Sequence, residues 1–149
     1  MIFNEEVKPS GHITFKLIGP DGKVKETREI KNLIVTAGKD YLANWLNQGT
    51  QSDYFMRYIA LGTGSTGALT TDTALDVEAG DRVEAAISGS GSQFVRQATV
   101  PADGVARAIT EAGLFSAVTG GTLFARQVFA VINKGVSDAL QVTWRITLS

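Results

Sequence analysis

Apolar and polar residues alternate with a period of two along several segments, which is the pattern of half-buried β-strands. The clearest case is residues 140–148, where every second residue is apolar: Leu140, Val142, Trp144, Ile146 and Leu148. Residues 12–18 alternate in the same way and lead into Pro20, Asp21 and Gly22, residue types that favour a tight turn. We therefore predict a hairpin of residues 12–18 and 23–30.

Further apolar runs extend this pattern along the chain. Five of them are short enough to be strands: 55–61, 83–87, 93–100, 105–116 and 122–132. One helix is expected, with Thr36 as its N-cap and an apolar stripe made of Tyr41, Leu42, Trp45 and Leu46. The pattern predicts a mainly β protein, an antiparallel β-sandwich or barrel of about seven to eight strands with one short helix.

The 149 residues correspond to a single domain, and no linker divides them. We expect residues 1–10 to form an N-terminal arm and residues 11–149 to form one β-rich domain. The arm carries Ile2 and Phe3 ahead of polar residues, so it would become ordered by docking on a neighbouring molecule. Ile2 and Phe3 are therefore candidate interface residues.

Composition narrows the classes of function. Fourteen basic and 15 acidic residues give a net charge of −1, which offers no electrostatic footprint for nucleic acid. The sequence contains no apolar stretch long enough to span a membrane and no signal peptide at its N-terminus. With no cysteine and a single histidine, it also excludes thiolate and multi-histidine metal sites and cysteine nucleophiles. We expect no cofactor, no metal, no catalytic residues and no enzymatic activity.

One segment matches a nucleotide-binding motif. Residues 62–67 read Gly-x-Gly-x-x-Gly after a predicted strand, as in dinucleotide sites. The residues that follow form a poor helix and no alternation of strands and helices surrounds them, so we interpret 62–75 as a flexible surface loop. Asp72 in this loop and Asp76 directly after it are interpreted as solvated charges.

Glu111 is the most informative charged residue, because it lies in the strongly apolar segment ITEAGLF. A buried glutamate has to be paired or hydrogen-bonded several times. Three arginines on predicted strands are candidate partners: Arg107, Arg126 and Arg145. We interpret Glu111 as part of a charge pair that fixes the register between strands or subunits. Glu111, Arg126 and Arg145 thus join the candidate interface residues, whereas Trp45 and Trp144 are expected in the core.

Four stretches carry a resemblance to a known group of proteins. They are KNLIVTAGKDYLANWL, RYIALGTGSTGALTTDTALDVE, ITEAGLFSAVTGGTLFARQVFAVINK and LQVTWRITLS. In this order they resemble small structural proteins of tailed-bacteriophage virions, which are capsid decoration (cement) proteins or tail-fibre and baseplate components. The similarity covers residues 31–149, and the order of the stretches is more specific than any one of them.

The resemblance implies a virion structural protein without catalytic residues or a bound cofactor. We expect a capsid decoration protein, located in the virion after assembly in the host cytoplasm, that reinforces contacts between major capsid subunits. Its partners would be the major capsid protein or other virion proteins, together with copies of itself in a dimer or trimer. Two alternatives stay open: a tail-fibre or baseplate component, and a β-sandwich module that binds carbohydrate or another small ligand.

Overall fold

The computed structural model describes residues 7–47 and 56–149. Within these ranges the chain forms nine β-strands and one helix, and every strand pairing is antiparallel. The elements are β1 (Pro9–Ile18), β2 (Val24–Ile34), α1 (Thr36–Asn47), β3 (Tyr58–Gly62), β4 (Val83–Glu84), β5 (Ala86–Ser88), β6 (Gln93–Val100), β7 (Arg107–Phe115), β8 (Leu123–Lys134) and β9 (Ala139–Leu148). The expectation of a mainly β, antiparallel protein with one helix is confirmed.

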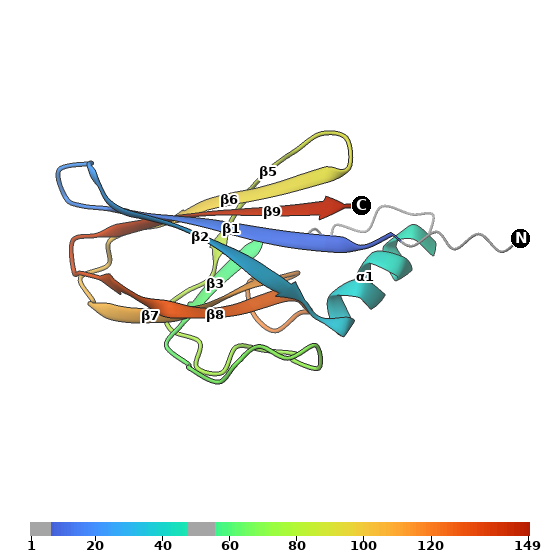
Figure 1. Ribbon diagram of the computed structural model, residues 1–149. Helices are drawn as coiled ribbons and strands as arrows, with labels where there is room; N and C mark the ends of the chain where they lie inside the picture. The colour runs from blue at the N-terminus through green and yellow to red at the C-terminus, as the bar shows by residue number, and fades with distance from the viewer. Residues whose placement is uncertain (1–6, 48–55) are drawn as a thin grey trace, which may run out of the picture.

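The nine strands form a single, nearly closed barrel in the order β4-β3-β7-β8-β2-β1-β9-β6-β5. Figure 1 shows two layers, with β1, β2, β9, β6 and β5 in one and β3, β7 and β8 in the other. Strand β2 joins them, since it pairs with β1 along most of its length and with β8 only at Leu33 and Ile34. The first and last strands in the order, β4 and β5, are separated by Ala85 alone.

The expected number of strands, seven to eight, is wrong because residues 83–87 do not form one strand. Val83 and Glu84 pair with β3, whereas Ala86 and Ile87 pair with β6 at the opposite end of the strand order. Ala85 lies at the corner with its side chain buried, and its N–H donates to Arg57 O at 2.6 Å. The apolar pattern contains no signal for this corner, because Ala85 continues an ordinary apolar run.

The core lies on the inner faces of the strands, as the period of two predicts. In the register of β1 with β9, three buried residues oppose three others: Ile13 and Trp144, Phe15 and Val142, Leu17 and Leu140. Trp144 is completely buried, so its expected place in the core is confirmed. Side chains of intervening residues such as Thr14 and Arg145 point to the other face of the sheet.

Helix α1 covers one end of the barrel (Figure 1). Its first turn begins on the Val35 carbonyl, which accepts the N–H of Lys39 at 3.1 Å. The residue before the helix is therefore Val35, and the expectation of Thr36 as N-cap is wrong by one position. Gly38 is buried, and a Cβ there would lie 2.3 Å from Phe124 O, so the helix rests directly on the backbone of β8.

Only half of the predicted apolar stripe on α1 is covered by the core. Tyr41 and Leu42 pack against the core cluster. Trp45 and Leu46 are 42% and 70% exposed, so the expected core position of Trp45 is wrong. The apolar periodicity correctly predicted the helix. It could not predict how much of the helix is covered, because that depends on how far the sheet beneath it extends.

The sheet begins inside the segment expected to be an arm. Lys8 and Ser149 exchange backbone hydrogen bonds of 2.7 and 3.1 Å, and Pro9 and Ser10 pair with β9. The boundary expected between residues 10 and 11 thus falls within β1. Ile2 and Phe3 lie outside the described residues.

Candidate functional site

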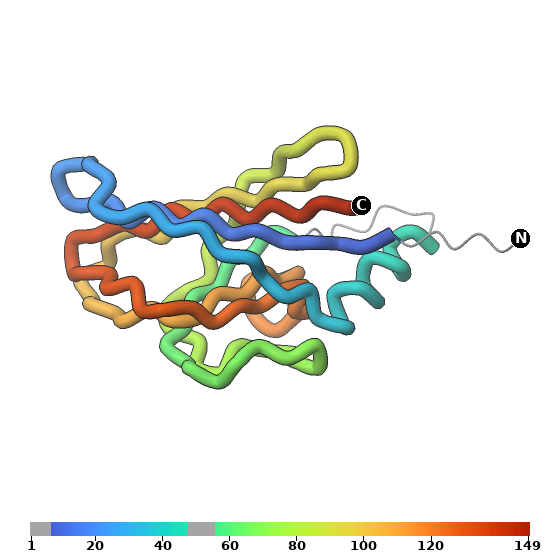
Figure 2. Tube along the Cα trace, in the orientation of Figure 1, coloured from blue at the N-terminus to red at the C-terminus, as the bar shows by residue number. Residues whose placement is uncertain are grey.

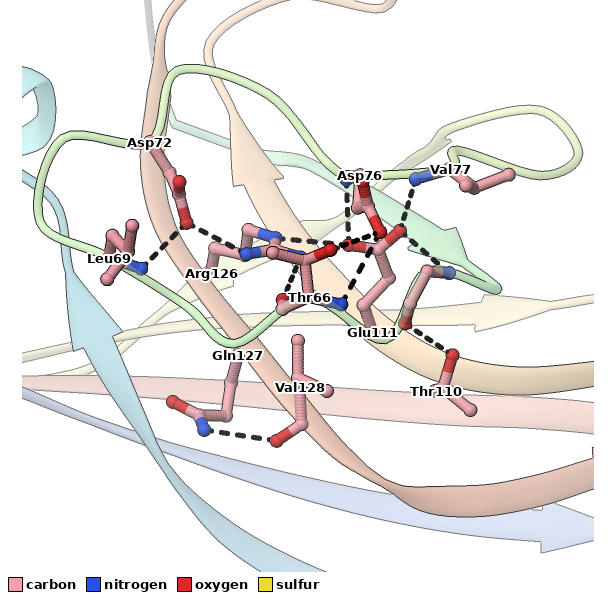
Figure 3. Close-up of polar contacts among 11 residues, drawn as sticks. Thr66, Leu69, Asp72, Asp76, Val77, Thr110, Glu111, Arg126, Gln127 and Val128 are labelled. Atoms are coloured by element: carbon pink, nitrogen blue, oxygen red, sulfur yellow. Dashed lines mark hydrogen bonds and ion pairs between the residues drawn. The ribbon is translucent and has the colours of Figure 1, made fainter.

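A long connection between β3 and β4, residues 63–82, runs along the outer side of the β3–β7–β8 layer (Figure 2, green). It contains most of the Gly-x-Gly-x-x-Gly motif and both Asp72 and Asp76. Two charged residues of the strands beneath it, Glu111 on β7 and Arg126 on β8, extend into this loop (Figure 3). Together they form a buried ion pair beneath the loop.

The Glu111 carboxylate binds the loop backbone at three points. Its Oε1 accepts the N–H groups of Gly64 and Val77 at 3.1 and 2.7 Å, and its Oε2 accepts the N–H of Asp76 at 2.9 Å. The side chain is 0% exposed. Because hydrogen bonds to a charged acceptor are stronger than neutral ones, one carboxylate fixes two distant parts of the loop to β7.

Arg126 completes the cluster from the neighbouring strand. Its Nε and Nη2 donate to Glu111 Oε2 at 3.0 and 2.8 Å, Nη1 donates to Asp72 Oδ2 at 2.8 Å, and Nη2 also donates to Thr66 O at 2.8 Å. Burial by itself would lower the pKa of Arg126, but the hydrogen bonds to Glu111 and Asp72 outweigh it and raise that pKa above its ordinary value. The buried guanidinium is therefore charged, and each of its three nitrogens donates at least one hydrogen bond.

The loop also carries its own internal hydrogen bonds. Asp76 Oδ2 accepts the Thr66 hydroxyl at 3.0 Å, a hydrogen bond that lowers the pKa of Asp76. Asp72 Oδ2 accepts the N–H of Leu69 at 2.8 Å. We call Thr66, Asp72, Asp76, Glu111 and Arg126 the latch.

The structure explains why the first two positions of the motif are glycines, which the sequence alone did not reveal. A Cβ on Gly62 or Gly64 would lie 2.5 or 2.6 Å from Glu111 Oε1, closer than real Cβ contacts allow. Gly67, the third glycine, has open space around its Cβ position. The motif therefore lets the backbone approach a carboxylate of the protein itself. The loop expected to be flexible is held to the strands by hydrogen bonds at Gly64, Asp76 and Val77.

An apolar contact also holds the loop. Leu75 is buried and belongs to a small cluster separate from the main core, with Val35, Ala60, Phe115 and Leu123. A second link is the N–H of Thr36, which donates to Thr70 O at 2.8 Å. The start of α1, β3, β7 and β8 are thus all joined to the same loop.

The geometry of the latch suits holding backbone rather than proton transfer. Five donor contacts reach the two oxygens of Glu111, and the side chain has no exposed surface on which a substrate could be received. In residues 7–47 and 56–149, no three His, Asp or Glu side chains are grouped to hold a metal ion.

Of the five candidate interface residues, the structure brings together Glu111 and Arg126. Arg145 is exposed on the outer face of β9, opposite His12 and Val95 in the register, and does not contact Glu111. Arg107, the other arginine considered as a partner, pairs with Asp103 at 2.6 Å. The expectation of a buried, paired Glu111 is confirmed. Its partner is Arg126, and the pair joins the neighbouring strands β7 and β8.

Sequence reasoning missed Asp72 and Thr66 as members of the latch. Asp72 was interpreted as solvated, whereas its carboxylate binds the buried guanidinium of Arg126. The available signal was the pair of leucines in this polar loop, because an apolar residue there can mark a return to the core. Leu75 is buried, whereas Leu69 is 59% exposed. Carboxylates beside such a residue are brought close to the side chains of the strands below.

No protein-family model matches this chain, and no curated protein matches it at a significant level. None of the helices in the described ranges is both long enough and apolar enough to cross a bilayer.

Proposed function

We propose that this protein is a structural component of a bacteriophage virion, and specifically a capsid decoration protein that reinforces contacts between major capsid subunits. The observation that carries the proposal is that three of the four resembling stretches meet at the loop that the latch holds. The stretch at 31–46 supplies Thr36, the stretch at 57–78 supplies the loop, and the stretch at 109–134 supplies Glu111 and Arg126. The resemblance thus marks a three-dimensional arrangement rather than scattered residues.

The loop that the latch holds has the properties of a preformed contact surface. Its exposed side chains are mostly short and uncharged: Thr63, Ser65, Thr70, Thr71 and Thr73. Leu69, in the same loop, is an apolar residue that is 59% exposed. Because the backbone is already fixed and short side chains have little rotamer entropy to lose, a partner can bind this surface at a low entropic cost.

Decoration works through differential binding. A protein that binds the assembled shell and not the free subunits stabilises the shell by mass action, with no need for catalysis. The loop held by the latch supplies one rigid contact surface. The outer face of β1, β9 and β6 supplies a second surface, which is made of Thr, Gln and Arg side chains. Two separate surfaces on one small domain suit a protein that bridges neighbouring subunits, or copies of itself in a dimer or trimer.

The deciding experiment is the copy number of this protein in purified virions, measured by quantitative mass spectrometry against the major capsid protein. A number comparable to that of the capsid subunit is expected for decoration. A handful of copies per particle would move the protein to the tail fibre or baseplate. Its absence from the particles would overturn the proposal.

The loop surface is tested by binding to particles that lack this protein. Leu69→Asp places a charge on the latched loop, and we expect it to weaken binding at least tenfold without lowering the melting temperature. Val24→Asp is the matched control, because Val24 is similarly exposed but lies at the start of β2, away from the loop. Equal binding by both variants would exclude the loop as the contact surface.

The arm is tested separately by removing residues 1–6, so that Lys8 and β1 are left intact. If Ile2 and Phe3 dock on a neighbouring virion protein, this truncation weakens attachment to particles while the melting temperature stays unchanged. Unchanged attachment would remove Ile2 and Phe3 from the interface.

A second candidate function, a module for a small ligand, is favoured by one groove. It has a volume of about 360 Å³ and lies between α1 and the β5–β6 hairpin, with Tyr41, Trp45 and Phe94 among its lining residues. Pockets of this size with aromatic walls and a few polar groups are typical of ligand sites. Retention on a glycan array that is lost in Trp45→Ala would support this candidate, and absence of retention would exclude carbohydrate.

A further inference from the structure

At the end of the barrel away from α1, the β8–β9 connection lies beside the β6–β7 connection (Figure 1), and Gly104 N donates to Val136 O at 3.1 Å. Lys134, the last residue of β8, has a side chain that is only 1% exposed. Its Nζ has no hydrogen-bond partner among the described residues. An ammonium group has three N–H donors, and leaving them unsatisfied away from water is costly.

The nearby carboxylates do not satisfy Lys134. Asp103 Oδ1 lies 3.7 Å from Nζ, close enough for an ion pair but beyond hydrogen-bond distance. That oxygen accepts the N–H of Val105 at 3.2 Å, and Asp103 Oδ2 accepts Arg107 Nη1 at 2.6 Å. The hydrogen bond from Arg107 is the largest of the contacts that lower the pKa of Asp103. Asp103 is thus already the partner of other groups.

Asp138 is engaged in the same way. Its carboxylate accepts Lys25 Nζ at 3.0 and 3.1 Å and the N–H of Gly135 at 2.8 Å. Together with Asp103, this gives two carboxylates against three cations, Lys25, Arg107 and Lys134. One positive charge remains uncompensated within this group of five side chains.

A pocket of about 300 Å³ opens at this group, and all three cations and Asp138 line it. A water molecule occupies about 30 Å³ of liquid, so the pocket has room for a small hydrated ion. We propose that it binds a small oxyanion, a phosphate or a carboxylate, between Lys25 and Arg107, with the buried Lys134 providing the charge beneath it. This site is independent of the virion proposal and is tested on the isolated full-length chain.

The test compares the melting temperature with increasing inorganic phosphate, with acetate, and with sodium chloride at the same ionic strength. A specific ion raises the melting temperature by about 3–5 °C when its concentration is roughly ten times its dissociation constant. A response to phosphate alone identifies a phosphate site, and a response to acetate alone identifies a carboxylate site. Saturating shifts of the Gly135 and Ala106 amide signals in an NMR titration separate binding from a general salt effect.

Lys134→Met removes the buried charge while keeping a similar length. We expect it to abolish the ion response and to raise the melting temperature in ion-free buffer, since a buried ammonium group without a hydrogen-bond partner is replaced by an apolar group. Lys25→Met, at an exposed position, provides a second variant that weakens the response without disturbing the core. Lys31→Met, an exposed lysine outside the pocket, is the control that keeps it. The proposal is overturned if neither anion exceeds sodium chloride, or if Lys134→Met responds like the wild type.

Discussion

Arg126 donates hydrogen bonds from Nε and Nη2 to the same oxygen of Glu111, Oε2, at 3.0 and 2.8 Å. The other oxygen of Glu111 binds only loop backbone. The ion pair between two strands and the attachment of the loop therefore share one carboxylate. Any change that removes this pair releases the surface on which the proposed contact depends.

Glu111→Gln should destabilise the protein strongly. It leaves the buried guanidinium of Arg126 without its main counter-charge, and breaking one partner of a buried pair costs about 3–5 kcal/mol. Urea unfolding followed by circular dichroism measures the loss of free energy. Arg145→Gln, on the exposed outer face of β9, should stay within about 0.5 kcal/mol of the wild type. Equal effects of the two changes would show that the latch does not stabilise the fold.

Proteolysis distinguishes loss of the loop from loss of the whole fold. In native conditions we expect Arg126→Met to be cleaved first within residues 63–82, because Asp72, Thr66 and Glu111 all lose a donor. Wild-type protein should resist cleavage there, since local opening has to break the same contacts. If Arg126→Met is cleaved elsewhere in the chain as fast as within residues 63–82, the latch does not hold this loop.

Two glycines of one loop provide a matched pair of substitutions. Gly64→Ala would place a Cβ 2.4 Å from the Asp76 Cβ and 2.6 Å from Glu111 Oε1, so we expect a loss of about 1–3 kcal/mol through forced displacement. Gly67→Ala meets nothing within 4 Å and should change stability by less than about 1 kcal/mol. Thermal unfolding of both variants is the measurement. A tolerated Gly64→Ala would mean that the carboxylate can move away from the loop.

The strands were predictable from sequence because their pattern is local. Each residue of β9 reports by its own polarity which face it occupies, so the buried positions of Trp144 and Val142 followed directly. The corner at Ala85 and the exposure of Trp45 depend on where distant strands end. No local pattern carries that information.

The latch was predictable only in part for the same reason. Burial of Glu111 followed from its apolar neighbours, and pairing followed from the cost of burying a charge. The choice of Arg126 among three arginines required the register of β7 with β8. The role of Gly64 required the fold of the whole loop around the carboxylate, which sequence spacing does not describe.

The two tryptophans should contribute very different amounts to the free energy of unfolding. Trp144→Ala removes a completely buried indole and should cost about 3–5 kcal/mol. Trp45→Ala removes a side chain that is 42% exposed on α1, and its cost should be about 1 kcal/mol or less. Urea unfolding gives both values, and acrylamide should quench the fluorescence of Trp45 far more than that of Trp144. Similar quenching of the two would show that Trp45 is shielded from solvent.

Acid should weaken the fold partly through Asp138. The N–H of Gly135, followed by Lys25, holds the pKa of this carboxyl below its ordinary value. A carboxyl with a lowered pKa in the folded state stabilises the fold fully above its unfolded pKa, about 3.9, and loses this contribution as the pH falls through the folded value. Asp138→Asn should therefore be less stable than the wild type at pH 7, with the difference shrinking below about pH 4. Unfolding measured from pH 7 to pH 2 tests this, with Asp40→Asn on the exposed side of α1 as control. A difference that stays constant with pH would show that Asp138 acts only through the shape of its turn.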